Sequence, residues 1–319
     1  MNNVLITGGC GFIGSNLIIH LLNNHVDMNI VNFDCLTYAA DTMYLKSVYT
    51  DDNYLLVMED IRDEVQVERV IKKYEIDSII HLAAESHVDN SINNPSEFVS
   101  TNINGTMVLL EAFRKFCSGR FLYVSTDEIY GALGPTGEFT ESSPLAPNSP
   151  YSASKAAAGL MVRSYYKTFN LNVVTTSCSN NYGRHQHREK LIPTVISTAL
   201  RGEPIPIYGD GTNVRDWLHV DDHCRAIDMV FRHGNRGEIY NVGGDNEVSN
   251  IDLVKKICAI LNRLKPAGAP YENQILFVKD RKGHDFRYAV DATKIKTELN
   301  WCPSDNFDIL LEQTIKHYV

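Results

Sequence analysis

The feature that most constrains the fold of this chain is a glycine-rich segment directly after its first apolar run. Residues 4–6 lead into Thr-Gly-Gly-Cys-Gly-Phe-Ile-Gly at positions 7–14, and a segment of helical length follows. Glycines at this spacing permit a tight turn, a close approach of the backbone to a pyrophosphate and close packing of the helix, whose N-terminus supplies N–H groups. The segment therefore predicts a dinucleotide site formed by Gly8, Gly11, Phe12, Ile13 and Gly14.

The acid at the end of the second apolar run indicates which dinucleotide fits. Asp34 follows residues 30–33 and lies twenty positions beyond Gly14. A carboxylate at this point accepts hydrogen bonds from a ribose diol and repels a 2′-phosphate, which favours NAD over NADP. After the third run, Asp60 and Ile61 are expected at the adenine edge, with a surface role for the acid as the equally weighted alternative.

Short apolar runs recur through the first half of the chain and alternate with segments of helical length. They cover residues 4–6, 30–33, 54–57, 78–82, 121–124 and 172–175. Strands that are apolar on both faces need helices on both faces, so the pattern predicts an α/β fold with a Rossmann-type doubly wound parallel sheet. Ligands bind at the carboxyl ends of such strands, where the small residues Ala83 and Ala84 leave room for a cofactor.

The pattern changes after about residue 178, where the apolar runs shorten and Gly and Pro become more frequent. We expect an NAD-binding domain over residues 1–177 and a smaller α/β substrate-binding lobe over most of 178–319. Residues 238–242 have the character of one more strand, and the segment 219–244 is expected to return to the main sheet. Residues 134–150, rich in Pro, Ser and Gly, predict a long surface connection.

Composition and charge exclude several classes of function. The formal charge of −9 and the lack of any long basic block argue against nucleic-acid binding. Seven scattered cysteines without metal-site spacing indicate reduced thiols in the cytoplasm and no metal site. The sequence shows no leader-type start and no apolar stretch of about 18 residues, so neither secretion nor membrane spanning is expected.

Tyr151 and Lys155 form the first candidate catalytic pair. They lie four residues apart in a segment of helical length, 151–169, and therefore share one helix face. A phenol titrates at about pH 10, and a neighbouring ammonium, together with the positive charge of a nicotinamide, favours the phenolate. The pair predicts a base for alcohol oxidation, with a structural tyrosine beside a solvated lysine as the alternative.

Thr126, Asp127 and Glu128 form a second candidate group, at the expected ligand end of the fifth apolar run. Adjacent carboxylates repel each other, so one of them can be held protonated while the other stays ionised. An acid and a base would then lie side by side. A solvated turn is the alternative interpretation.

These residues belong to a longer series of motifs. GGCGFIGSN, AAESHVDNSI, STDEIYG, YSASK, CSNNYG, EKLIP, YGDGTNVRDW and RKGHDFRYAVD, in this order, resemble the nucleoside-diphosphate-glucose 4,6-dehydratases, which are extended short-chain dehydrogenase/reductases. The Thr-Asp-Glu triplet discriminates, since the similar sugar 4-epimerases usually carry a Ser-rich triplet there. The resemblance implies a retained NAD and dehydration of dTDP-glucose, or of UDP-glucose or a related sugar, to a 4-keto-6-deoxy sugar.

The resemblance also implies roles for individual residues. Tyr151, assisted by Thr126 and Lys155, would deprotonate the hydroxyl on glucose carbon 4. Glu128 would then take the proton from carbon 5, and protonated Asp127 would donate to the hydroxyl that leaves carbon 6. Expected ligand contacts are Asn181, Arg215, Arg281 and His284 at the diphosphate, Pro206, Tyr208, Glu189, Lys190 and Leu191 around the base, and Ser86, Asn102 and Asn180 at ribose or sugar hydroxyls, with buried structural roles as the open alternative for the last three.

The chain departs from the family pattern mainly at residues 184–188, where Arg-His-Gln-His-Arg replaces a proline-containing stretch. A changed base, a changed sugar or a different packing of the loop would each explain this departure. A 4-epimerase and a decarboxylase are alternatives for the whole chain, and the adjacent carboxyl groups argue against both. A non-catalytic NAD-binding protein is a third alternative, and it would have no reason to keep the acid, the base and the Tyr-Lys pair together. Helices near 102–116 and 151–169, with Val108, Leu109, Leu160 and Met161, are expected to form a homodimer interface, with core packing as the alternative.

Overall fold

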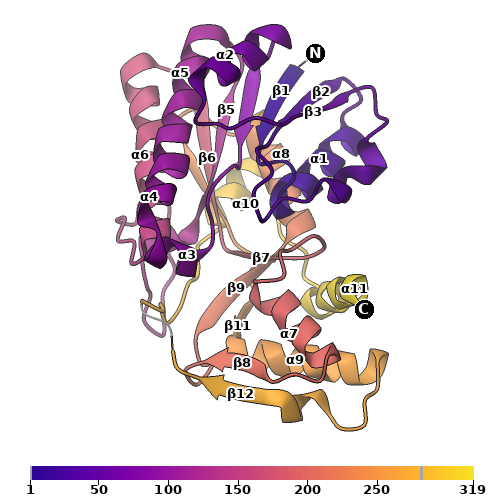
Figure 1. Cartoon of the computed structure of the whole chain (residues 1–319). Coiled ribbons are helices and arrows are strands. Elements are labelled where there is room, and N and C mark those ends of the chain that lie inside the picture. The colour runs from indigo at the N-terminus through magenta and orange to yellow at the C-terminus, as the bar shows by residue number, and fades with distance from the viewer. Residues whose placement is uncertain (1, 281–282) are drawn as a thin grey trace.

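Within residues 2–280 and 283–319, which the computed structural model describes, seven parallel strands form the central sheet (Figure 1). They are β1 (Asn2–Thr7), β2 (Met28–Phe33), β3 (Tyr54–Val57), β4 (Ser78–His81), β5 (Phe121–Thr126), β6 (Val173–Cys178) and β10 (Ile239–Val242). Their spatial order is β10-β6-β5-β4-β1-β2-β3. The order reverses at β1 and β4, which confirms the predicted doubly wound, Rossmann-type sheet.

The strands form where the sequence predicts them, because they are the segments that can be buried on both faces. Every residue of β4, β5 and β6 is buried, as expected for parallel strands that lie between two layers of helices. The late segment 238–242 also joins this sheet, since β10 pairs in parallel with β6 from Ile239 opposite Thr175 to Val242 opposite Cys178.

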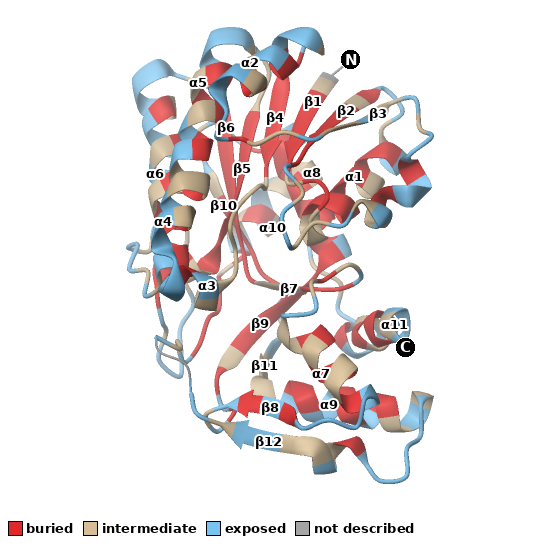
Figure 2. Cartoon of the chain, in the orientation of Figure 1, coloured by how far each residue is buried: buried red, intermediate tan, exposed pale blue. Residues whose placement is uncertain are grey.

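Helices cover both faces of the sheet. On one face lie α1 (Phe12–Asn24) and α8 (Val220–His233), with α10 (Thr293–Leu299) against β10. On the other face lie α2 (Glu64–Lys73), α5 (Thr106–Phe116) and α6 (Pro150–Phe169). Shorter helical segments lie between these elements. They are η1 (Thr42–Val48), α3 (Val88–Asn93), α4 (Pro95–Phe98), the π-helical η2 (Val99–Gly105) and η3 (Asp127–Tyr130). Figure 2 shows the buried strands between helices whose outer faces are exposed.

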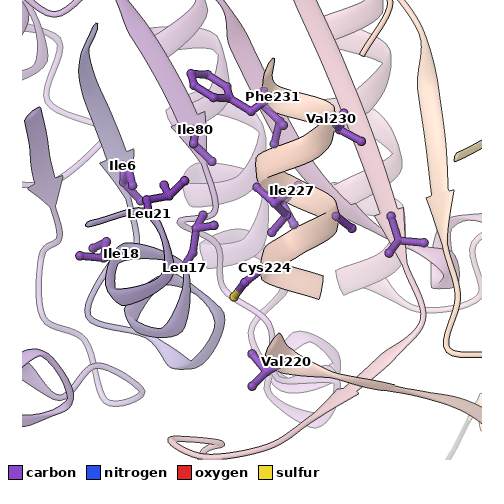
Figure 3. Close-up of a cluster of buried hydrophobic side chains, with 14 of the residues drawn as sticks. Ile6, Leu17, Ile18, Leu21, Ile80, Val220, Cys224, Ile227, Val230 and Phe231 are labelled. Carbon is purple, nitrogen blue, oxygen red and sulfur yellow. The ribbon is translucent and has the colours of Figure 1, made fainter. Parts of the chain in front are cut away.

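A buried apolar cluster attaches α1 and α8 to the sheet (Figure 3). It contains Leu17 and Leu21 of α1 together with Cys224 and Ile227 of α8, at the spacing that places residues on one helix face. None of the four is more than 1% exposed, and burial of a Leu or Ile side chain contributes about 1.5–3 kcal/mol. This packing holds α1, and with it the glycine-rich segment, in place on the sheet.

A second, smaller region lies below the sheet in the view of Figure 1. It contains β7 (Asn180–Tyr182), β9 (Val214–His219) and β11 (Glu247–Ser249), the parallel pair β8 (Ile205–Tyr208) and β12 (Ile275–Val278), the helices α7 (Leu191–Leu200), α9 (Asn250–Leu264) and α11 (Phe307–Tyr318), and the turn η4 (Tyr271–Gln274). An apolar cluster of its own includes Tyr182, Trp217 and Leu253. The domain division at residues 177 and 178 stays a prediction.

Of the residues predicted at the interface on α5 and α6, Leu109 does not lie at the surface. Leu160 is 52% exposed on α6, whereas Leu109 is fully buried. The prediction for Leu109 is wrong because this side chain lies on the face of α5 that packs on the sheet. Among the described residues, no helix combines the length and the apolar character needed to cross a bilayer.

Candidate active site

The glycine-rich segment connects β1 to α1 through very close backbone contacts. Gly8 has a φ of +72°, and a Cβ added to it would lie 2.8 Å from the Cα atom of Ala83. A Cβ on Gly14 would lie 2.2 Å from the carbonyl oxygen of Gly8. Around Gly11, which caps α1, the Gly8 carbonyl oxygen at 3.3 Å is the only described atom within 4 Å of such a Cβ. The turn therefore requires Gly8 and Gly14 for packing and leaves the Gly11 side open.

Asp34 lies against this turn. Its Oδ2 accepts the Cys10 N–H at 2.9 Å and its Oδ1 accepts the Leu36 N–H at 2.8 Å. Burial raises the pKa of Asp34, and the two backbone N–H groups oppose that shift. A carboxylate has about four acceptor positions, so Asp34 retains capacity to accept hydrogen bonds from a diol next to the glycine turn.

Hydrogen bonds join the carboxyl ends of β1 and β4. The Thr7 hydroxyl lies 2.7 Å from His81 Nδ1 and accepts the N–H of Ala83 at 3.2 Å. Burial lowers the pKa of His81 to about 3, so its ring is neutral at pH 7. Ala83 and Ala84 follow as half-buried small residues, which leaves space across the strand ends.

The other residues predicted at the cofactor have protein partners. The Asp60 carboxylate forms an ion pair with Arg62, with an Oδ2 to Nη2 distance of 2.6 Å. The Ile61 side chain is buried, and a Cβ on Gly105 would lie 2.5 Å from its Cδ1. The Ile61 side chain belongs to the apolar core, so its predicted place at the adenine edge stays a prediction.

Asn102 connects two segments near the same edge. Its Oδ1 accepts the Glu85 N–H at 2.8 Å, and its Nδ2 donates to the Glu85 carbonyl at 3.0 Å and to the Ser154 hydroxyl at 2.8 Å. Both amide hydrogens are thus used inside the protein. This geometry corresponds to the structural alternative for Asn102.

Thr126, Asp127 and Glu128 end β5 and begin η3. The Thr126 hydroxyl caps η3 by accepting the Glu128 N–H at 3.3 Å. Asp127 is 2% exposed, and among the described residues no partner binds its Oδ2. Burial, the Glu128 charge and the Asp216 charge raise the pKa of Asp127 well above its usual range, against the opposing effect of Arg215. Burial and the neighbouring carboxylates therefore favour the protonated form of Asp127, which can donate a proton.

Tyr151 and Lys155 reach the same place from α6. This helix begins with a capping box between Ser149 and Ser152, and Pro150 occupies its first turn, which places both residues near its start. Lys155 Nζ donates to the carbonyl oxygen of Val124 on β5 at 2.7 Å. Burial lowers the pKa of Lys155 to about 7.

The predicted Tyr151 phenolate needs the charge of a nicotinamide as well as that of Lys155. Burial raises the pKa of Tyr151, the Glu128 charge adds to this effect, and a hydrogen bond with Thr126 only partly opposes it. The protein residues alone therefore keep the phenol protonated. A positive charge bound beside the ring would act in the opposite direction.

Arg215 is a buried cation at the border of the two regions. Its guanidinium donates to the main-chain carbonyls of Val214, Asp285 and Phe286 at 2.7–3.2 Å and lies 4.5 Å from the ring centroid of Tyr288. Its charge acts on Asp127. Arg215 thus holds the 285–286 segment and faces the acid of the site.

The two asparagines predicted near the substrate differ in their surroundings. Asn181 is engaged, with its Oδ1 2.8 Å from His223 Nδ1 and its Nδ2 donating to the Ser179 carbonyl at 3.0 Å. Asn180 Oδ1 is buried without a hydrogen-bond partner among the described residues. Asn180 therefore retains an acceptor.

The predicted substrate loop contacts the segment after β4. Lys190 Nζ donates to the Ser86 carbonyl at 3.4 Å. The Glu189 carboxylate lies 3.5 Å from His87 and 3.4 Å from His187. Leu191 begins α7 and packs on the apolar cluster of the second region, which includes Tyr182 and Trp217. The structure thus brings Ser86, Glu189 and Lys190 together.

Three further predicted residues lie in the second region, farther along the chain. Pro206 and Tyr208 point to the exposed face of β8, and the Tyr208 ring meets His284 edge-on at 6.3 Å. His284 Nδ1 lies 2.7 Å from Asp280 Oδ1. Arg281 lies outside the described residues.

Cys178 is a site residue that the sequence prediction missed. It ends β6 directly opposite Thr126, and burial raises the pKa of its thiol to about 12. The thiol lies near Tyr151 and Lys155 and is uncharged at pH 7. Its signal was available, because Cys178 ends a buried run at the same sheet edge as Thr126.

Comparison with known proteins agrees with this geometry. A family model described as GDP-mannose 4,6 dehydratase matches residues 5–314. The dTDP-glucose 4,6-dehydratase of Xanthomonas campestris pv. campestris (strain B100) is 49% identical over 326 residues, which cover 99% of this chain and 92% of that protein. The chain belongs to the nucleotide-sugar 4,6-dehydratase family.

Solved structures show how far the likeness extends for this 4,6-dehydratase family member. The dTDP-glucose 4,6-dehydratase of Streptomyces venezuelae, solved with NAD bound, has a TM-score of 0.93 and 44% identity over 99% of this chain and 96% of that one. The dTDP-glucose 4,6-dehydratase of Bacillus anthracis, also solved with NAD, has a TM-score of 0.91 and 46% identity, and the match covers 100% of this chain and 96% of that one. A UDP-glucose 4-epimerase of Thermotoga maritima has a TM-score of 0.90 but only 28% identity, and the match covers 99% of this chain and 98% of that one. The resemblance to dehydratases is confirmed.

The buried carboxyl of Asp127 predicts a dependence of stability on pH. The pKa of Asp127 in the folded protein lies above the ordinary value of 3.8. Between these two pKa values the folded protein keeps a proton that the unfolded chain loses, so the stability that this group contributes falls as the pH rises from the unfolded to the folded pKa. Asp127→Asn does not titrate. Its free energy of unfolding, relative to the unchanged chain, should therefore increase between pH 4 and 8 by up to about 1.4 kcal/mol per pH unit.

Urea unfolding at several pH values measures this difference. The exposed Asp305→Asn variant is the matched control, and it should show no comparable change with pH. A pH-independent difference for Asp127→Asn would show that the carboxyl is ionised in the folded protein.

Proposed function

We propose that this chain dehydrates a nucleotide-activated glucose, with dTDP-glucose as the expected substrate, to the 4-keto-6-deoxy sugar. The observation that carries the proposal is the buried Asp127 carboxyl, with its raised pKa, beside Glu128 at the strand end that Tyr151 and Lys155 also reach. Elimination of water needs an acid for the leaving hydroxyl and a base for the carbon-bound proton. A 4-epimerase needs neither, since it exchanges hydrogen only at carbon 4.

NAD is part of this proposal, and the residues present fit it. The open side of Gly11 at the start of α1 suits a pyrophosphate, and the buried Asp34 carboxylate suits a ribose diol. When bound, NAD accepts a hydride from the sugar and later returns it. Its positive nicotinamide would also offset the burial and the Glu128 charge that raise the pKa of Tyr151.

The protein residues then move three protons. Tyr151, hydrogen-bonded to Thr126, takes the proton from the hydroxyl on carbon 4, and the ketone formed there acidifies the hydrogen on carbon 5. Glu128 takes that hydrogen as a proton. Asp127 donates its proton to the hydroxyl leaving carbon 6, so that water is released. Reduction of the double bond between carbons 5 and 6 would then use the hydride returned to carbon 6 and a proton returned to carbon 5 by Glu128.

The substrate nucleotide is assigned to the second region. Arg215 and Asn180 are proposed as ligands of the diphosphate and sugar hydroxyls, supported by the buried guanidinium that faces Asp127 and by the free acceptor of Asn180. Glu189, Lys190 and Tyr208 are proposed around the base. A cytoplasmic location belongs to the same proposal and is supported by seven cysteines that are all free thiols.

Incubation of the purified protein with dTDP-, UDP-, GDP- and CDP-glucose tests the proposal. We expect the 4-keto-6-deoxy product chiefly from dTDP-glucose. A turnover that favours UDP-glucose would revise the base, and interconversion of the carbon 4 configuration without loss of water would replace dehydration with epimerisation.

Variants of the two proposed bases should fail at different steps. Tyr151→Phe keeps the ring and its packing but lacks the proton acceptor, so turnover should fall by about 10²–10⁴-fold with no deuterium from D₂O entering carbon 5. Glu128→Gln should also lose that exchange while still oxidising carbon 4, which appears as accumulated reduced cofactor. Normal deuterium incorporation in Glu128→Gln would remove Glu128 from the mechanism.

A homodimer through α5 and α6 is also proposed. Its support is a set of exposed apolar side chains on η2, α5 and α6, namely Val99, Met107, Phe116, Leu160 and Phe169. Exposed apolar surface that is grouped in this way marks protein interfaces.

Substitution of Leu160 tests the dimer. Leu160→Arg should convert a dimer into a monomer in sedimentation equilibrium, because it brings an unpaired charge into an apolar interface. The control Leu276→Arg changes an equally exposed leucine of β12 and should leave the mass unchanged. A dimer that survives Leu160→Arg would place the interface elsewhere.

A further inference from the structure

Residues 184–188, where the chain departs from the family pattern, do not pack mainly against the proposed sugar site. Arg184 and Asn16 form a reciprocal pair instead. Arg184 Nε donates to Asn16 Oδ1 at 2.6 Å, and Asn16 Nδ2 donates to the Arg184 carbonyl at 3.1 Å. Because Asn16 also donates to the Phe12 carbonyl at 2.9 Å, Arg184 is attached to the first turn of α1, directly after the glycine-rich segment.

His185 makes a second attachment. Its ring stacks on Tyr44 of η1 with centroids 4.3 Å apart and an interplanar angle of 4°. Its Nδ1 lies within hydrogen-bond distance, 3.1 Å, of the Ser15 hydroxyl on α1. The backbone of His185 is left-handed, with a φ of +68°, a conformation that non-glycine residues hold only where the surroundings maintain it.

The other side of this loop is fixed to the second region. The Tyr318 hydroxyl at the end of α11 contacts the carbonyls of Gly183 and Gln186 at 3.2 and 2.9 Å. Gln186 Nε2 donates to the Asn181 carbonyl at 2.8 Å. The loop is therefore anchored in one region and attached to α1 and η1 in the other.

The two attachment points lie on either side of the turn that fits a dinucleotide. Ser15 and Asn16 follow Gly11 by one helical turn. Tyr44 belongs to η1, which follows the segment from Asp34, and the Asp41 N–H in that segment donates to the Cys10 carbonyl at 2.9 Å. The loop thus connects the segments on both sides of the Asp34 carboxylate.

We propose that Arg184 and His185 act as positioning residues that hold these two segments together and so retain NAD in its site. The inference rests on the proposed function for the presence of NAD. Ordered binding groups slow dissociation, because their conformational entropy is already lost in the protein. Arg184 and His185, two residues of the departing stretch 184–188, would then act on the retention of the cofactor.

The rate at which bound NAD exchanges with excess labelled NAD tests this proposal on the holoenzyme. His185→Asn removes the stacked ring but suits a left-handed backbone, and Arg184→Ala removes the side-chain bond to Asn16. Each should raise the exchange rate about tenfold or more, with kcat at saturating NAD within about twofold of the unchanged chain. The exposed His233→Asn and Arg201→Gln are matched controls and should leave the exchange rate unchanged.

A double-mutant cycle separates the Asn16–Arg184 pair from a general loss of stability. Asn16→Ala removes the contact with the Arg184 side chain and also the bonds from Asn16 to the Phe12 and Arg184 carbonyls, so NAD should exchange at least as fast as in Arg184→Ala. The double variant should be no faster than Asn16→Ala, since the side-chain contact is already lost there. Additive effects, or unchanged NAD exchange with a raised KM for the nucleotide sugar, would overturn the proposal. Failure of the unchanged chain to bind NAD at all would instead overturn the proposed function and, with it, this inference.

Discussion

The parallel register of the central sheet is the constraint on which the candidate site depends. Thr126 of β5 lies opposite Cys178 of β6, and Thr7 of β1 lies opposite His81 of β4. Because these strands run in the same direction, the polar residues that end them collect at one edge. Lys155 then returns to this edge by its hydrogen bond to the β5 backbone. A shift of one residue in β5 would turn the side chain of Thr126 to the opposite face of the sheet.

Burial controls protonation at this edge. It raises the pKa of Asp127 and of the Tyr151 phenol, and it lowers the pKa of Lys155 to about 7 and of His81 to about 3. Each of these groups is thereby displaced toward its neutral form. The protein thus supplies proton donors and acceptors with little fixed charge, and a charged ligand would determine which of them ionises.

The sequence allowed a correct prediction of the fold because buried parallel strands carry a local signal. The apolar runs coincide with strands, and the late run 238–242 rejoins the sheet as β10. The glycine turn and the acid Asp34 were equally local features. What the sequence could not reveal were side-chain partners distant along the chain: the Glu85 contacts of Asn102, the main-chain carbonyls on Arg215 and the contacts of Arg184 with Asn16. The burial that raises the pKa of Tyr151 could not be predicted for the same reason, since it depends on tertiary packing.

The return of β10 to the large sheet has a consequence for the order of folding on the ribosome. The chain leaves the first apolar cluster after Cys178, returns at Leu218, leaves again after Val242 and returns once more at Ala292. Until β10 has been synthesised, β6 has an unpaired outer edge, and the apolar face of α1 lacks α8. Unpaired edges and uncovered apolar faces favour association between incomplete chains. The first apolar cluster ends with Trp301 and that of the second region with Ile315, so most of the polypeptide must emerge before either core closes.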